Sequence, residues 1–77
     1  MNAPASPESV RFDPEKMWID LSDGRTLGVP LSWSPRLMAA TPQQREQVTL
    51  SPRGLHWEEL DEDLSIAGLL AGVKAWR

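Results

Sequence analysis

The sequence has no cysteine, a single histidine and no long apolar stretch. Without cysteine, a disulfide framework, a thiolate nucleophile and a Cys-ligated zinc or iron–sulfur site are all excluded. The longest apolar stretch, Ile66 to Val73, covers eight residues, whereas a membrane-spanning helix needs about 20. The first residues, MNAP, have neither the basic start nor the apolar run of a secretory signal. We therefore expect a cytoplasmic protein with no membrane contact.

Length and composition indicate one small domain. The chain has 77 residues, of which 40% are hydrophobic and 25% charged, and its formal net charge is -3. A chain this short has room for one hydrophobic core and buries only roughly 60–65% of its unfolded surface. Residues 1–7, MNAPASP, contain two prolines and two alanines. We predict a disordered tail over residues 1–7 and a single domain over residues 8–77, with its first strand near residues 8–12.

Apolar residues at odd-numbered positions predict a hairpin and determine the length of its loop. They lie on both sides of Asp23-Gly24 and are Met17, Ile19, Leu21, Leu27, Val29 and Leu31. A two-residue loop would place the two rows on opposite faces of the sheet, whereas a three-residue loop over residues 22–24 places them on the same face. Such a loop puts Gly24 in the left-handed conformation. It also sets Trp18 opposite Gly28, where the ring can cover the gap that the glycine leaves.

Prolines and capping residues predict where the following elements begin and end. Pro30 restricts the second strand to an edge or to its end, because proline cannot donate to a ladder. Ser34-Pro35 is typical of a helix N-cap followed by the first helical position. Thr41 and Gln44 have the spacing of a capping box. Short strands are expected over residues 48–50 and 55–57, with a turn between them.

The last quarter predicts a helix and completes the fold class. Its apolar residues recur at i, i+3, i+4 and i+7, which is one face of an amphipathic helix: Ile66, Leu69, Leu70 and Val73. Ser65 or Asp63 can cap this helix. We predict an α+β domain with a small antiparallel sheet of three to five short strands. Its central hairpin covers residues 16–31, and two or three short helices pack on one face.

The single histidine, His56, does not predict a catalytic or metal site. A Ser–His–acid triad needs an oxyanion pocket as well as the three side chains, and no GxSxG motif occurs. One histidine with carboxylates is a poor transition-metal site. Neither GxGxxG nor GxxxxGK[ST] is found. We expect no enzyme activity, no cofactor and no metal, with His56 on the outer side of its strand.

Charge distribution favours protein over nucleic acid as a partner. The eight basic residues are scattered singly, and the pI is near 4.9, which disfavours binding to phosphate backbones. Five of the eleven acids fall within residues 58–63: Glu58, Glu59, Asp61, Glu62 and Asp63. The helix dipole accounts for one or two acids at a helix start, and five exceed that need. We therefore predict that these carboxylates form a contact surface.

Tryptophan supplies the second part of the predicted contact surface. The chain has four tryptophans, and a core this small needs bulky side chains, so core packing accounts for most of them. Tryptophan and arginine are the commonest interface hot spots. We therefore add Trp33, Trp76 and Arg77 to the predicted partner-binding residues.

The order of short motifs resembles a small bacterial family, number 2442 among the domains of unknown function. The matching segments run from about Val10 to Leu70, and they include Leu21-Ser22-Asp23-Gly24-Arg25, Val29-Pro30-Leu31-Ser32-Trp33, Pro35-Arg36-Leu37, Ala40-Thr41, Arg45, Leu55-His56-Trp57, Leu60-Asp61-Glu62-Asp63 and Gly68-Leu69-Leu70. The resemblance implies a compact α+β domain without established catalytic residues. It also implies small proteins that stand alone or beside a helix-turn-helix, often in arrangements suggestive of toxin–antitoxin pairs.

These observations predict a non-catalytic inhibitor that blocks a larger bacterial protein or complex through an acidic and aromatic surface. Two versions remain open: an antitoxin-like neutraliser, and an anti-CRISPR-like protein that occupies a nucleic-acid-binding channel. The alternative is an accessory subunit of a transcriptional regulator. We expect no direct binding of nucleic acid, and a monomer or weak homodimer.

Overall fold

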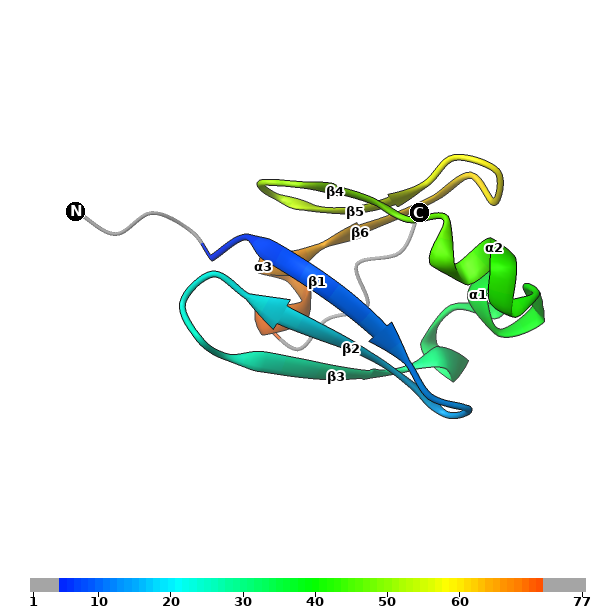
Figure 1. Ribbon diagram of the computed structural model, residues 1–77, viewed down its shortest axis with the longest axis horizontal. Coiled ribbons are helices and arrows are strands. Elements are labelled where there is room, and N and C mark those ends of the chain that lie inside the picture. Colours follow the sequence, from blue (N-terminus) through cyan, green and yellow to red (C-terminus); the bar gives the residue numbers. More distant parts are fainter. Residues whose placement is uncertain (1–4, 72–77) are drawn as a thin grey trace.

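The computed structural model describes residues 5–71, which form an α+β domain with two three-stranded antiparallel sheets and short helices (Figure 1). The strands are β1 (Pro7–Phe12), β2 (Lys16–Leu21), β3 (Thr26–Pro30), β4 (Thr49–Ser51), β5 (Gly54–Trp57) and β6 (Glu62–Ser65). The helical segments are η1 (Leu31–Trp33), α1 (Pro35–Ala39), α2 (Pro42–Glu46) and α3 (Ile66–Leu70). The predicted fold class is confirmed.

The strands divide between two sheets, in the orders β1-β2-β3 and β4-β5-β6. We call these sheet A and sheet B. Buried residues from both sheets belong to one hydrophobic cluster: Met17, Ile19, Leu21 and Val29 from sheet A, and Leu55, Trp57 and Leu64 from sheet B. Sheet B therefore covers the apolar face of sheet A. Helices α1 and α2 lie at one end of the molecule, and α3 follows β6 toward the other end (Figure 1).

The predicted hairpin register is confirmed. Ile19 pairs with Leu27, and Trp18 pairs with Gly28. Gly24 has φ of +92°, as the three-residue loop requires. A Cβ built on Gly28 would lie 2.6 Å from Trp18 Cζ3, so the indole ring covers this glycine. The strand β3 lies at the edge of sheet A and ends at Pro30.

The N-terminal boundary needs a correction. Strand β1 begins at Pro7, which is buried and pairs with Leu21. The backbone N–H of Ser6 donates to Ser22 Oγ at 2.9 Å, and Ala5 packs against the core. These contacts show that residues 5–7 belong to the folded part of the chain, whereas we had predicted a tail through residue 7. Residues 1–4 lie outside the described residues.

Both predicted helix starts are confirmed. The Ser34 side chain accepts a hydrogen bond from the Leu37 N–H at the start of α1. Thr41 and Gln44 form a complete capping box at the start of α2, with each side chain bonded to the other residue's backbone N–H. Within residues 5–71, no helix is long and apolar enough to cross a membrane.

The segment before the last helix differs from the prediction. Glu62 and Asp63, which we predict at the start of the last helix, lie in strand β6 instead, and α3 covers Ile66–Leu70. Ser65 caps α3 through a bond from the Gly68 N–H, as predicted. Ile66 and Leu69 are buried, whereas Leu70 is exposed. The predicted fourth position of this apolar face, Val73, lies outside the described residues.

Candidate functional site

The acidic segment is a tight turn between two strands of sheet B. Strand β5 ends at Trp57 and β6 begins at Glu62. Between them, the Asp61 N–H donates to the Glu58 carbonyl at 3.2 Å. Asp61 has φ of 51°, a left-handed conformation that aspartate tolerates better than most residues. The five predicted carboxylates are therefore divided between this connection, which carries Glu58, Glu59 and Asp61, and strand β6, which carries Glu62 and Asp63.

Glu62 is not part of a contact surface, which corrects the prediction. Its exposed fraction is 2%, because β6 alternates and its first residue faces the core with Leu64. Ser34 Oγ donates a hydrogen bond to Glu62 Oε2, and Oε1 is buried with no partner among the described residues. A buried carboxyl needs such a partner to offset its lost hydration. Glu62 thus joins β6 to the start of α1 and does not meet a ligand at the surface.

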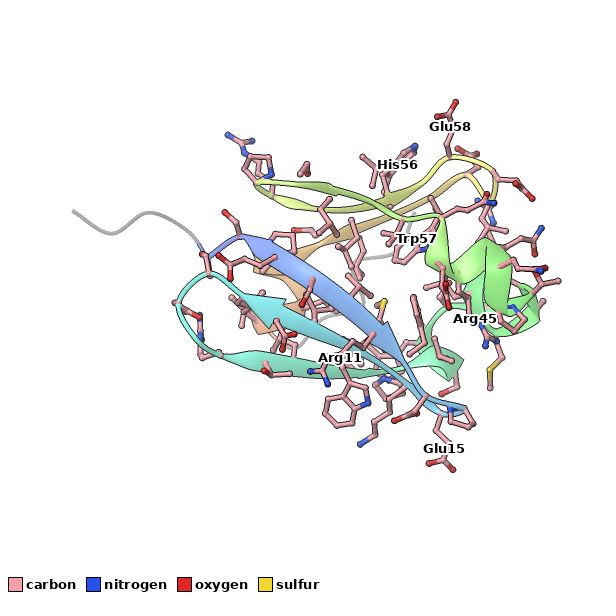
Figure 2. The ribbon with its side chains drawn as sticks, viewed as in Figure 1. Arg11, Glu15, Arg45, His56, Trp57 and Glu58 are labelled. Carbon is pink, nitrogen blue, oxygen red and sulfur yellow. The ribbon has the colours of Figure 1, made fainter. Side chains whose placement is uncertain are left out.

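Asp63 faces the outer side of sheet B and is paired within the chain. It lies directly opposite His56 on the neighbouring strand, and Asp63 Oδ1 lies 2.5 Å from His56 Nδ1. His56 points outward and Trp57 inward, as predicted (Figure 2). Among the described residues, no group of three or more His, Asp or Glu side chains is placed to hold a metal ion.

The three remaining carboxylates form what we call the acidic turn: Glu58, Glu59 and Asp61, all exposed. The Asp61 side chain is 94% exposed, and Figure 2 shows Glu58 projecting away from the body of the molecule. The acidic turn therefore keeps part of the predicted surface, but with three carboxylates where five were predicted.

Two side chains from the helical end anchor the acidic turn. Arg36 of α1 donates to the Leu60 carbonyl at 3.3 Å and to the Asp61 carbonyl at 2.5 Å, and its guanidinium lies 3.9 Å from the Asp61 carboxylate. Gln44 of α2 donates to Glu59 Oε1 at 2.8 Å. Sequence reasoning missed these anchors, because no local pattern shows that residues 15 to 25 positions apart meet.

Of the three residues predicted for the second part of the surface, only Trp33 lies within the described residues. Trp33 is half-buried and packs against the core, while Trp76 and Arg77 lie outside the described residues. An exposed apolar side chain not singled out from sequence, Met38 of α1, is 49% exposed at the helical end. Arg45 donates to the carbonyls of Leu37 and Met38 at 2.7 and 2.9 Å, which ties α2 to α1.

A second feature is an open groove of about 460 Å³ on sheet B. Its floor includes Gly54, and the side chains around it come from the three strands (Ser51, His56, Asp63 and Ser65) and from the β4–β5 turn (Arg53). The strand positions share the outer face of the sheet, since Ser51 pairs with Gly54, which pairs with Ser65, and His56 pairs with Asp63. His56, which we had placed outward, is thus one wall of a groove.

Sheet A carries a third set of charged groups. The Trp18 Nε1–H and the backbone N–H groups of Glu15 and Lys16 donate to Asp13 and hold its pKa below 3.8. In the turn between β2 and β3, a hydrogen bond from the Arg25 side chain lowers the pKa of Asp23.

Asp20 accepts three hydrogen bonds, as Asp13 does. Hydrogen bonds from the Ser9 and Thr26 hydroxyls, and then one from Arg11, hold its pKa below 3.8. These donors come from β1 and β3, so Asp20 joins the three strands. Asp13, Asp20 and Asp23 therefore stabilise the turns and strands of sheet A through hydrogen bonds from within the chain.

Comparison with known proteins gives a family and two similar structures. A family model described as protein of unknown function (DUF2442) matches residues 7–75. A crystal structure of a protein of unknown function from Rhodospirillum rubrum is 34% identical over 91% of this chain and 89% of that chain, with a TM-score of 0.77. A solution structure of an uncharacterised protein from Chromobacterium violaceum is 27% identical over 90% of this chain and 67% of that chain, with a TM-score of 0.76. No curated protein matches.

Proposed function

The chain belongs to the DUF2442 family of proteins of unknown function, and we propose that it is a non-catalytic inhibitor whose acidic turn docks on a basic surface of a larger bacterial protein. The observation that supports this most is the anchoring of an exposed acidic turn. Glu58, Glu59 and Asp61 project into solvent, while Arg36 holds the backbone beneath them.

The anchoring lowers the entropic cost of binding. A free loop loses conformational freedom when it docks, and a loop already held in its bound shape loses less. Arg36 binds two consecutive carbonyls of the turn, and Gln44 orients the Glu59 carboxylate. These bonds leave the second oxygen of Glu59 and the whole carboxylate of Glu58 available to a partner's arginine or lysine side chains.

The chemistry of the turn points to a partner with a concentrated positive surface. Proteins that bind nucleic acids carry such surfaces because they must neutralise phosphates. A small acidic protein bound to such a positive surface would exclude the nucleic acid from it. This mode of action fits an antitoxin-like neutraliser of a nucleic-acid-binding toxin, or an anti-CRISPR-like inhibitor acting in the cytoplasm. With a net charge of only -3, long-range steering is modest and sensitive to salt.

The experiment compares two variants with the same net charge. E58Q/E59Q/D61N removes the charges of the acidic turn, and E8Q/E15Q/E46Q removes three exposed charges elsewhere; in Figure 2, Glu15 lies on the opposite side of the molecule from Glu58. A partner is captured from the native host, identified by mass spectrometry and purified. The turn variant should bind it roughly tenfold more weakly, since rim charges contribute about 0.2–1 kcal/mol each.

Two results would contradict the proposal. Equal loss of affinity in both variants would show that only net charge matters and that the turn is not the docking surface. Retention of long duplex DNA by the wild-type protein in a low-salt gel shift would favour the alternative, an accessory subunit of a transcriptional regulator.

A further inference from the structure

The groove on sheet B contains an arginine that the fold does not use. Arg11 and Arg25 pair with Asp20 and Asp23, and Arg36 and Arg45 donate to backbone carbonyls. By contrast, the Arg53 guanidinium has no hydrogen bond or ion pair to any residue within 5–71, although it lines the groove. A guanidinium presents its donors in a planar fork that matches a carboxylate, so Arg53 is free to bind one.

The backbone of Arg53 is held by the fold, whereas its side chain is exposed. The Arg53 carbonyl accepts a hydrogen bond from the Ile66 N–H at 3.0 Å, which ties the β4–β5 turn to the start of α3. The next residue, Gly54, leaves the groove floor bare. A Cβ built on Gly54 would lie 2.0 Å from the Leu64 carbonyl oxygen, so the close approach of β5 and β6 requires a glycine there. The base of the groove is therefore a rigid part of the sheet.

The other groups around the groove determine what charge a bound ligand group can carry. His56 Nδ1 lies 2.5 Å from Asp63 Oδ1, so the Asp63 carboxylate already has a partner within the chain, although its side chain is 56% exposed in the groove. The Ser65 hydroxyl accepts from the Gly68 N–H, which leaves its proton available for donation. One uncompensated guanidinium and one hydroxyl donor suit a ligand group with a single negative charge better than a doubly charged phosphate.

From these observations we propose that the groove is a second binding site, which takes the side-chain carboxylate of an acidic peptide segment. Arg53 binds the carboxylate with its forked donors, and Ser65 donates a further hydrogen bond. The groove is open to solvent rather than enclosed, so a side-chain carboxylate can enter it while the peptide segment that carries it remains outside. This site has the opposite charge preference from the acidic turn and does not depend on the function proposed for that turn.

An NMR titration of the full 77-residue protein tests the site. The probe is N-acetyl-glutamate α-amide, which carries only the side-chain carboxylate, and the matched neutral probe is the corresponding glutamine derivative. We expect the amide resonances of Gly54, Leu55 and Ser65 to shift with the acidic probe, with a dissociation constant on the order of millimolar for so small a ligand. The neutral probe should leave these resonances unchanged.

Variants assign the binding to Arg53. R53Q should weaken binding at least tenfold, because a hydrogen-bonded charge pair is lost. R53K keeps the charge without the fork and should weaken it several-fold. R11Q, on sheet A, should bind like the wild type. Unchanged resonances outside the groove verify that each variant is folded.

Three results would overturn the proposal: no shifts in the groove, equal shifts with the neutral probe, or undiminished binding in R53Q. Stronger binding of inorganic phosphate, or of N-acetylglycine with its terminal carboxylate, would overturn the choice of a side-chain carboxylate. None of these results bears on the acidic turn, whose partner is measured separately.

Discussion

Ser34 and Glu62, 28 positions apart, are joined by a buried hydrogen bond in which the serine hydroxyl donates to the carboxylate. The same hydroxyl oxygen accepts the Leu37 N–H at 3.2 Å and so caps α1. One side chain thus caps the start of the helix and gives the buried acid the only partner that it has within residues 5–71. Through this pair, the helical end is fixed to the strand that follows the acidic turn.

Replacing Ser34 should therefore cost more than a helix cap alone. In S34A the cap is lost, at about 0.5–2 kcal/mol, and a buried carboxylate loses its partner, at about 1–3 kcal/mol. We expect the free energy of unfolding to fall by about 2–4 kcal/mol in urea denaturation. T41A, which removes the equivalent cap of α2 at an exposed position, should cost about 1 kcal/mol. Equal losses in the two variants would mean that the Glu62 contact contributes nothing.

Gly54 should not tolerate alanine. The added Cβ would meet a backbone carbonyl of β6, which cannot move aside as a side chain can, so β5 and β6 must separate. We expect G54A to lower the free energy of unfolding by more than about 2 kcal/mol and to weaken hydrogen-exchange protection in β6 before that in β2. Wild-type stability for G54A would show that the two strands lie further apart than described.

Acid should destabilise the protein through sheet A. The pKa values of Asp13, Asp20 and Asp23 are lowered in the folded state, so these groups add stability above their ordinary pKa near 3.8. That stability is lost as the pH falls through the lowered values. The unfolding free energy should decrease between about pH 4 and pH 2, and D20N should show a shallower decrease. An identical slope in D20N would argue against the hydrogen bonds from Ser9 and Thr26.

A variant of Asp61 distinguishes the contribution of this residue to stability from its contribution to partner binding. Its positive φ is a conformation that glycine adopts without strain, and its carboxylate is almost fully exposed. D61G should therefore keep or slightly raise the free energy of unfolding, by up to about 1 kcal/mol, while partner binding weakens. A large loss of stability in D61G would show that the carboxylate is needed for the fold and not for docking.

Local patterns were sufficient to predict the hairpin and both helix caps. The loop of residues 22–24 followed from the parity of Ile19 and Leu27, because a strand has a side-chain period of two. The caps at Ser34 and Thr41 followed from proline at the next position. Each of these features depends on residues that are close together in the sequence.

The short strands predicted at residues 48–50 and 55–57 are present as β4 and β5, but β6 was harder to predict because its inward positions include an acid. Glu62 and Leu64 face the core, and Asp63 and Ser65 face outward, which is the alternation of a strand. Hydrophobic periodicity does not detect such a strand when one inward residue is charged. The sequence therefore predicts a helix start at these acids, where the structure has a strand. Their partners Ser34, Arg36 and Gln44 lie far away in the sequence, and only the tertiary fold shows that they meet.

The most direct test of the account is the affinity of the purified partner for E58Q/E59Q/D61N and for E8Q/E15Q/E46Q, measured by calorimetry at the same ionic strength. The account predicts roughly tenfold weaker binding for the turn variant and near-wild-type binding for the control. Wild-type affinity in the turn variant would contradict it, because the carboxylates that Arg36 and Gln44 hold in place would then have no part in binding.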